Sequence, residues 1–389
     1  MKHNFDEIID RRASECKKYE AACYPADVLP MWIADTDFAV PKEISTAIQK
    51  RAQHPCFGYP VEDFGFEESV KRWEKVRFGW DIEADWVKYA HGVLPFLMYA
   101  IRAFTYPGDK VIIQSPIYPP FPTIIRHNGR TVVDSPLVQD ENGVYQIDFE
   151  DFEEKLKCTR AKLFFMSNPH NPTMRAFTRE ELTRLGELCL KYNVIVVSDE
   201  IHCDLTYKGH EHIPFGSISE AFAQNSMVLV NPSKTFNIAG FRTGAAIIPN
   251  QKMRDNIQIT IANNKNYGRT IFGMLSFITA YTECDYYADE MVEYLEENKN
   301  YIVDFIKTRV PRIKLAVPDA TYLMWLDCRG LNMSQNELKK FFFEKAKLGL
   351  NSGDTFGENG TGFMRMNIAC PKATLVEGLN RLEAAVNAL

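Results

Sequence analysis

Short apolar runs alternate with helical patterns along the first two thirds of the chain. The strand-like runs are Val87–Ala90, Val111–Ile113, Leu163–Met166, Val194–Ser198, Met227–Val230 and Gly244–Ile248. Several of them are separated by segments in which apolar residues recur on one helical face. This alternation predicts an α/β fold, a mostly parallel central sheet with helices on both faces.

Two of the expected helices have clear beginnings. Thr178 and Glu181 have the spacing of a capping box, and apolar residues follow on one face at Leu182, Leu185, Cys189 and Tyr192. A second helix follows Gly92 and carries Leu94, Leu97, Met98 and Ile101 on one face. We expect both apolar faces to lie in the core.

The pattern changes near Asp285. Strands are expected at Ala320–Asp327 and Gly362–Ala369, and Ser334 with Glu337 should cap a helix between them. This indicates a smaller α+β domain. We therefore divide the chain into residues 1–45, which contribute to the small domain and the active site, a large domain over 46–284, and a small C-terminal domain over 285–389.

Composition narrows the classes of function. The 389 residues carry a net charge of −6 and no Lys/Arg-rich block, so nucleic acid and acidic membranes are not expected partners. Nine cysteines without a Cys-x-x-Cys pair suggest free thiols in a reducing compartment, and we expect no metal site. Asp6, Glu7 and Asp10 replace the apolar stretch of a signal peptide, so a cytoplasmic location is expected.

The first candidate for chemistry is Lys234. It lies among small and turn-forming residues between Asn231 and Arg242, directly after the apolar run Met227–Val230. A lysine presented by a short loop at the end of a buried strand can lose its proton and act as a nucleophile through a Schiff base. Taken alone, Lys234 is better explained as a surface lysine in an ordinary connecting loop.

Two further polar residues follow strand-like runs. Asp199 comes after Val194–Ser198, and Asn171 lies in a turn with two Asn-Pro steps after Leu163–Met166. Ligands bind at the carboxyl ends of the strands in parallel sheets, so Asp199 and Lys234 are both candidates for one pocket. A carboxylate there can pair with a protonated pyridine nitrogen, and an amide can donate to a phenolate-like oxygen. Asp199 as a helix cap and Asn171 as a plain turn residue remain alternatives.

Alternation in the C-terminal strand separates Met364, Met366 and Ile368 from Arg365 and Asn367. If the methionines face the core, Arg365 faces a cleft. A guanidinium there can bind the α-carboxylate of an amino acid through two parallel hydrogen bonds. A solvent-facing arginine on a half-exposed strand is the alternative.

In this order the segments resemble the fold-type I family of pyridoxal-phosphate enzymes, the aspartate aminotransferase superfamily. Within it the chain is most similar to the MalY/PatB-type cystathionine β-lyase branch. The motifs that carry this resemblance span nearly the whole chain and are Leu29–Phe38, Phe57–Pro60, Ser115–Phe121, Asn168–Pro172, Ser198–His202 and Ser233–Gly240.

The resemblance implies pyridoxal 5'-phosphate as cofactor and assigns a role to each matching residue. Lys234 would hold the cofactor and serve as catalytic base. The other cofactor contacts would be Gly92, Val93 and Leu94 at a helix N-terminus, Tyr118 stacked on the ring, Asn171, Asp199, His202, Ser233, Arg242, and Tyr59 from the partner subunit of a homodimer. Arg365, Asn171 and Ala34 would bind the substrate. Tyr118 as a core aromatic, Tyr59 as a turn residue and His202 as a structural residue remain alternatives.

Two positions depart from the family's usual pattern. Met174 stands where glycine usually continues the Asn-Pro motif, so a positive φ there would cost about 1 kcal/mol or more. Asn231 replaces a small residue three positions before Lys234 and can alter a phosphate contact. Neither change removes a reactive group.

The activity implied by the resemblance is a carbon–sulfur β-lyase that cleaves an L-amino acid to a thiol, pyruvate and ammonia. A class I/II aminotransferase is the alternative, because both reactions need the same residues. A ligand-sensing regulator on this fold would carry an added DNA-binding domain, and no basic helix-turn-helix precedes these motifs. The natural substrate among cystathionine, cysteine and S-conjugates stays open.

Overall fold

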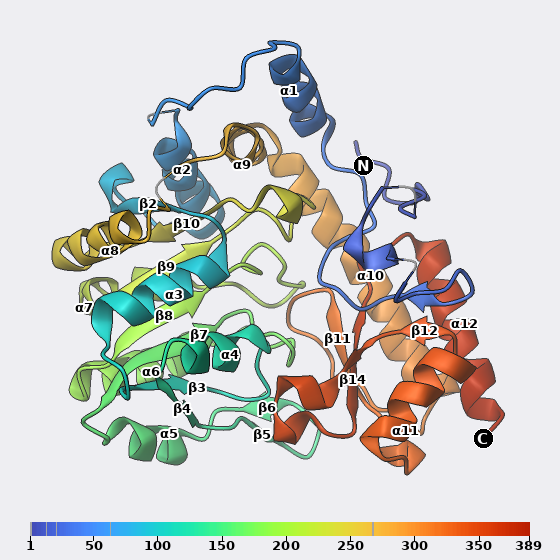
Figure 1. Ribbon diagram of the computed structural model, residues 1–389. Coiled ribbons are helices and arrows are strands. Elements are labelled where there is room, and N and C mark those ends of the chain that lie inside the picture. Colours follow the sequence, from blue (N-terminus) through green and yellow to red (C-terminus); the bar gives the residue numbers. More distant parts are fainter. Residues whose placement is uncertain (1, 13, 21, 63, 267) are drawn as a thin grey trace.

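The computed structural model describes residues 2–12, 14–20, 22–62, 64–266 and 268–389, and Figure 1 shows their arrangement. Within them a seven-stranded sheet has the order β2-β10-β9-β8-β7-β3-β4. Its strands are β2 (Val87–Ala90), β3 (Lys110–Ile113), β4 (Thr131–Asp134), β7 (Ala161–Ser167), β8 (Ile195–Asp199), β9 (Ser226–Val230) and β10 (Gly244–Ile247). All neighbouring strands from β9 to β4 pair in parallel, whereas β10 is antiparallel to both β9 and β2.

Helices cover both faces of this sheet (Figure 1). Along β7, Leu163 and Phe165 pack in one core cluster, whereas Phe164 and Met166 pack in another. The first cluster includes residues of three helices: α3 (Val93–Phe104), α4 (Pro120–His127) and α8 (Gln251–Asn263). The second includes residues of five helices: α2 (Phe66–Phe78), α5 (Phe149–Leu156), α6 (Arg179–Lys191), α7 (Glu220–Gln224) and α9 (Ile271–Glu283). Burial on both faces explains why the strands are continuous apolar runs.

The C-terminal third forms a second layer beside the sheet (Figure 1). Its three-stranded sheet has the order β11-β14-β13, from β11 (Leu323–Asp327), β13 (Asn351–Ser352) and β14 (Phe363–Asn367). The helices there are α10 (Asp285–Arg309), α11 (Gln335–Lys340) and α12 (Lys372–Asn387). Leu375, Leu379 and Leu382 on one face of α12 are fully buried, so the core continues into this layer.

The N-terminal segment is fixed against this second layer. β1 (Leu29–Pro30) pairs in parallel with β12 (Leu348–Gly349), and α1 (Lys42–Ala52) follows. Asn367 in β14 donates hydrogen bonds to the carbonyls of Ile33 and Asp35 at 2.7 and 2.6 Å. The chain between β1 and α1 therefore lies between the C-terminal layer and the large sheet.

The expected fold class is confirmed, and so are both capping boxes, at Thr178 and Ser334. The strand expected over Ala320–Asp327 begins only at Leu323, because Ala320 and Thr321 bond instead to the carbonyls of Met174 and Leu205. β4 was not predicted; it is a short edge strand with partly exposed residues. α10 begins at Asp285, but the division into domains over 1–45, 46–284 and 285–389 stays a prediction.

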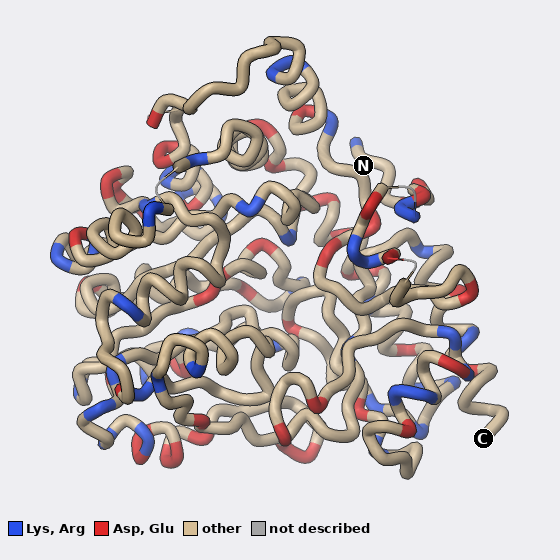
Figure 2. Tube along the Cα trace, in the orientation of Figure 1, with Lys and Arg blue, Asp and Glu red and all other residues tan. Residues whose placement is uncertain are grey.

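Charged residues of both signs are interspersed along the whole trace (Figure 2). All nine cysteines are free. In the parts of the chain that the structure describes, we find no helix with the length and apolarity needed to span a bilayer.

Candidate active site

A cavity of about 630 Å³ opens where β7, β8 and β9 end. Ser167 and Asp199 are register partners at the ends of β7 and β8, and both face this cavity. Its other lining residues are Lys17, Trp32, Ile33, Ala34, His91, Gly92, Val93, Leu94, Pro95, Tyr118, Asn171, Ile201, His202, Asn231, Ser233, Lys234, Ala239, Arg242, Asn351 and Arg365. Every site residue expected from the sequence lies here except Tyr59.

Lys234 lies in the loop after β9, half-buried in the cavity wall. Its Nζ donates a hydrogen bond of 2.6 Å to the carbonyl oxygen of Ala34. Burial lowers the pKa of Lys234 to about 8, and the positive charge of Arg365 acts in the same direction, against the opposing effects of Asp35 and Asp199. The amine is therefore unprotonated near neutral pH far more often than that of an ordinary lysine, as a nucleophile or base requires.

Asp199 ends β8 and is 6% exposed. Its carboxylate accepts a hydrogen bond of 3.2 Å from the backbone N–H of Ile201. Burial raises the pKa of Asp199 to about 7, although that hydrogen bond and the positive charge of Lys234 both lower it. A buried acid of this kind gains much from a cationic partner, which a protonated ring nitrogen would provide.

Arg365 extends from β14 to the cavity and is 4% exposed. It donates to Asn171 Oδ1 at 2.8 Å, to Asn351 Oδ1 at 2.7 Å and to the carbonyl of Trp32 at 3.1 Å. Its Nε is buried without a partner among the described residues. The guanidinium is thus held rigidly at the cavity, and the solvent-facing alternative is wrong.

The bond from Arg365 also orients Asn171. Since Oδ1 of Asn171 accepts from the guanidinium, the amide nitrogen is the group left to donate into the cavity. Asn171 is itself 6% exposed and fixed in the turn between β7 and α6. This arrangement favours the predicted contact with a ring oxygen.

One end of the cavity can hold an anion. Gly92 precedes α3 with φ of 99°, a conformation that favours glycine, and no side chain caps the free N–H groups that follow. Arg242 and Ser233 line the same cavity, and Ser233 N donates to Asn231 Oδ1 at 2.9 Å. Helix N–H groups together with a guanidinium suit a phosphate.

Tyr118 and His202 complete the wall. Burial raises the pKa of the Tyr118 phenol and lowers that of the His202 imidazole well below its ordinary value, so both are neutral at pH 7. His202 is 2% exposed, and its Nδ1 has no partner among the described residues. The roles of both residues stay predictions.

Tyr59 does not belong to its own chain's cavity. Its side chain is fully exposed in the segment between α1 and α2, as are large parts of Phe57 and Val61. This placement leaves the predicted contact with a partner subunit untested.

Sequence reasoning missed several lining residues, among them Lys17, Trp32, His91 and Asn351. Trp32 was within a recognised motif, but nothing assigned it a contact. Asn351 is an edge-strand residue without a motif, and only the pairing of β13 with β14, which sets Asn351 opposite Arg365, brings it to the site.

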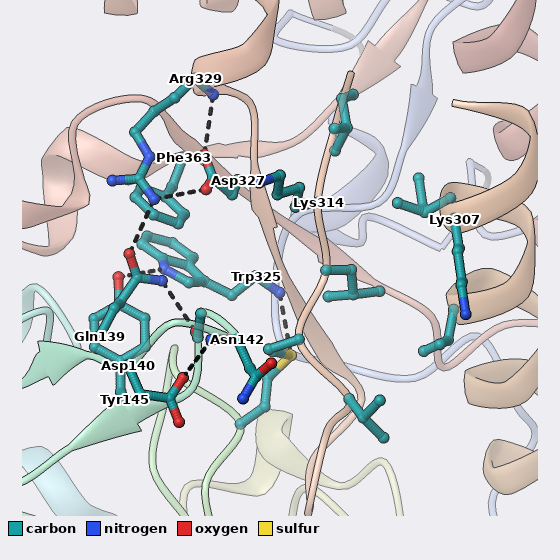
Figure 3. Close-up of a pocket in the computed structure, with 18 of the residues that line it drawn as sticks. Gln139, Asp140, Asn142, Tyr145, Lys307, Lys314, Trp325, Asp327, Arg329 and Phe363 are labelled. Atoms are coloured by element: carbon teal, nitrogen blue, oxygen red, sulfur yellow. Dashed lines mark hydrogen bonds and ion pairs between the residues drawn. The ribbon is translucent and has the colours of Figure 1, made fainter. Parts of the chain in front are cut away.

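A second cavity, of about 470 Å³, is lined by Tyr145, Trp325 and Phe363 among others (Figure 3). The indole of Trp325 donates to the hydroxyl of Tyr145 at 3.2 Å and stacks on Phe363, and the backbone N–H of Trp325 donates to Met174 Sδ at 3.3 Å. Lys234 and Asp199 do not line it. We therefore take the cavity around Lys234 as the candidate active site.

The family's sequence profile, described as aminotransferase class I and II, matches residues 27–382. This chain belongs to that family. The resemblance drawn from the motifs is confirmed, for the superfamily by this profile and for the MalY/PatB-type branch by the relatives that follow.

Individual relatives agree over the full length. The chain is 40% identical to cystathionine β-lyase PatB of Bacillus subtilis, with 99% of this chain and 100% of the relative covered. Its fold superposes on cystalysin of Treponema denticola, whose structure contains pyridoxal 5'-phosphate, with a TM-score of 0.96, 32% identity and complete coverage of both chains. The PLP-bound C–S lyase of Staphylococcus hominis gives a TM-score of 0.91 at 31% identity, covering 99% of this chain and 98% of the other.

Proposed function

We propose that this protein is a pyridoxal-phosphate-dependent carbon–sulfur β-lyase that converts an L-amino acid to a thiol, pyruvate and ammonia. The observation that carries the proposal is the convergence of Lys234, Asp199 and Arg365 on one cavity. It supplies an amine with a lowered pKa, a buried acid and a rigid guanidinium. Full-length relatives that are C–S lyases support this activity over others.

The residues present fit the cofactor. The unprotonated amine of Lys234 suits the cofactor's aldehyde, and Asp199 suits its pyridine nitrogen. At the phosphate end, a Cβ on Gly244 would lie 2.9 Å from Asn231 Nδ2 and 3.5 Å from Gly92 Cα, so glycine keeps this end open. Bound there, pyridoxal phosphate supplies an electron sink for the electron pair released at the substrate's Cα.

The chain's own residues then act on the substrate. Arg365 binds the α-carboxylate, and the Asn171 and Asn351 bonds hold the guanidinium in place, which fixes the Cα–H bond near Lys234. The amine of Lys234 removes the Cα proton as general base. The Cβ–S bond then breaks with its electron pair leaving on sulfur, and the remaining three-carbon fragment takes up water to give pyruvate and ammonia.

We also propose that the protein works as a homodimer. The segment between α1 and α2 exposes Phe57, Tyr59, Val61 and Phe64, an unusual number of large apolar side chains for one short segment. Burial of this stretch against a second copy would remove it from water. Tyr59 would then contact the phosphate in the partner's cavity, as the family resemblance implies.

Transamination is the alternative reaction of the same residues. An absorbance spectrum of the holoenzyme, recorded before and after cystathionine is added, should change while pyruvate and free thiol accumulate together. A spectral change that yields a keto acid and the aminated cofactor without free thiol would instead establish an aminotransferase. Lys234→Ala should abolish turnover, and full turnover in that variant would overturn the proposal.

A further inference from the structure

Lys17 lies at the cavity with no role in the chemistry above. The charged residues that line the cavity are Asp199 and four cations: Lys17, Lys234, Arg242 and Arg365. The last three are used by the cofactor and the substrate's α-carboxylate. The ammonium of Lys17 forms no hydrogen bond or ion pair with the residues that the structure describes, so its charge is free to bind a ligand.

The local structure directs Lys17 to the cavity. It begins a single 3₁₀ turn, Lys17–Tyr19, in which successive side chains point about 120° apart. The next residue, Lys18, is 1% exposed and forms an ion pair with Asp37 at 2.8 Å. Because Lys18 is fixed in the protein interior, Lys17 points elsewhere, and its side chain is exposed at the cavity wall.

Trp32 connects this turn to the carboxylate site. Its Nε1 donates to the carbonyl of Lys18 at 3.2 Å, and its own carbonyl accepts from Arg365 at 3.1 Å. Its indole stacks on Tyr24 with ring centroids 5.4 Å apart. The lysine turn and the guanidinium are therefore both bonded to the same tryptophan, and Lys17, Trp32 and Arg365 line one cavity.

We propose that Lys17 forms a subsite for an anionic group on the leaving-group side of the substrate. This inference rests on the proposed function and specifies its substrate class: cysteine thioethers whose sulfur substituent carries a carboxylate. The α-carboxylate binds Arg365, the thioether passes Trp32, and the distal carboxylate binds Lys17. Apart from Asp199, no acidic side chain lines the described part of the cavity, so a cationic substituent would find no partner.

A matched pair of substrates isolates this contact. S-(2-carboxyethyl)-L-cysteine and S-propyl-L-cysteine have substituents of similar length, and only the first carries a distal charge. In Lys17→Gln holoenzyme, kcat/KM for the carboxyethyl substrate should fall about fivefold, mainly through KM, as expected for an exposed ion pair. The value for the propyl substrate should stay within twofold. Lys17→Glu should reverse the preference in favour of S-(2-aminoethyl)-L-cysteine.

Lys252→Gln serves as the control, because this exposed lysine of α8 lies outside the cavity. Equal effects of Lys17→Gln on both substrates, or no effect on either, would overturn the subsite. Failure of the proposed function gives a different result: the wild-type enzyme would release no pyruvate from either substrate. In that case calorimetric titration of the holoenzyme with the same pair decides: weaker binding of the carboxyethyl compound alone in Lys17→Gln supports the subsite, and unchanged binding overturns it.

Discussion

At the scale of single residues, the site depends on burial that shifts the ionisation of a few groups. Burial lowers the pKa of Lys234 to about 8 and raises that of Asp199 to about 7. Each charge also stabilises the other, since Asp199 raises the pKa of Lys234 and Lys234 lowers that of Asp199. Both groups therefore change ionisation within the range in which the protein is handled.

The first prediction concerns the attachment of the cofactor to apoprotein. Attachment needs the unprotonated amine, so its rate should rise about tenfold per pH unit below pH 8 and level off above it. An ordinary lysine would give a rate that rises to above pH 10. Stopped-flow absorbance after mixing apoprotein with pyridoxal phosphate measures this profile.

Asp199→Asn provides the matched control. Removing the negative charge of Asp199 removes an effect that raises the pKa of Lys234, so the midpoint of the profile should move to lower pH. A wild-type midpoint near 10, the value for an ordinary lysine, would contradict the role of Lys234. A midpoint that moves to higher pH in Asp199→Asn would contradict the role of Asp199.

Met174 shows strain at a single residue. It has φ of 65°, as anticipated for a position where glycine is usual, yet its side chain is 3% exposed. Its backbone carbonyl accepts bonds from Asp319 and Ala320, and its Sδ accepts from Trp325 N. Packing and these bonds hold the methionine in the left-handed conformation.

The second prediction concerns Met174, where the positive φ favours glycine and the buried side chain favours methionine. Met174→Ala should lower the free energy of unfolding by about 2–5 kcal/mol through lost packing. Met174→Gly should cost about 1 kcal/mol less than alanine, because glycine has no penalty at positive φ. Met166, buried in β7, serves as the control position. There Met166→Gly should have a lower free energy of unfolding than Met166→Ala. Urea unfolding measures these free energies. If the glycine variant were the less stable one at both positions, the inferred strain at Met174 would be contradicted.

At the scale of elements, the hydrophobic pattern located most strands, because the parallel strands are buried on two faces, and the Ser/Thr–Glu spacing located both capping boxes. The pattern could not give the antiparallel direction of β10, which depends on its partners β2 and β9. It also missed β4 and lengthened β11, since edge exposure and the loop contacts of Ala320 and Thr321 are tertiary effects.

The third prediction concerns β10 and its neighbours. A methyl group at Gly244 would lie 2.9 Å from Asn231 Nδ2, so Gly244→Ala should displace the phosphate end of the cavity and weaken cofactor binding by about tenfold, a cost of about 1.4 kcal/mol. Gly240→Ala has open space and should leave affinity unchanged. Fluorescence titration of apoprotein with pyridoxal phosphate compares them, and equal affinity in both variants would contradict the proposed phosphate position.

At the scale of the whole molecule, the cavity is assembled from segments far apart in the chain. Lys234 bonds to Ala34, 200 residues earlier, and Arg365 bonds to Asn171, 194 residues earlier. The same logic extends to a second copy if Tyr59 completes the partner's site.

The fourth prediction tests this by complementation. Lys234→Ala and Tyr59→Ala should each lower activity when alone. Unfolding and refolding the two variants together forms mixed dimers in which one site has both wild-type residues, so about a quarter of wild-type activity should return. Light scattering should give about twice the chain mass of 44.7 kDa. A monomer, or a mixture no more active than its components, would contradict the shared site.

The sequence by itself determined the fold class and the reactive groups. Buried parallel strands require continuous apolar runs, and reactive residues follow those strands directly, so Lys234, Asp199 and Asn171 could be found by local pattern. Only the tertiary structure decided which groups face them: Asn351 reaches Arg365 through strand pairing, and Lys17 reaches the cavity because Lys18 is held by Asp37. These contacts join distant segments, and no local pattern along the chain encodes them.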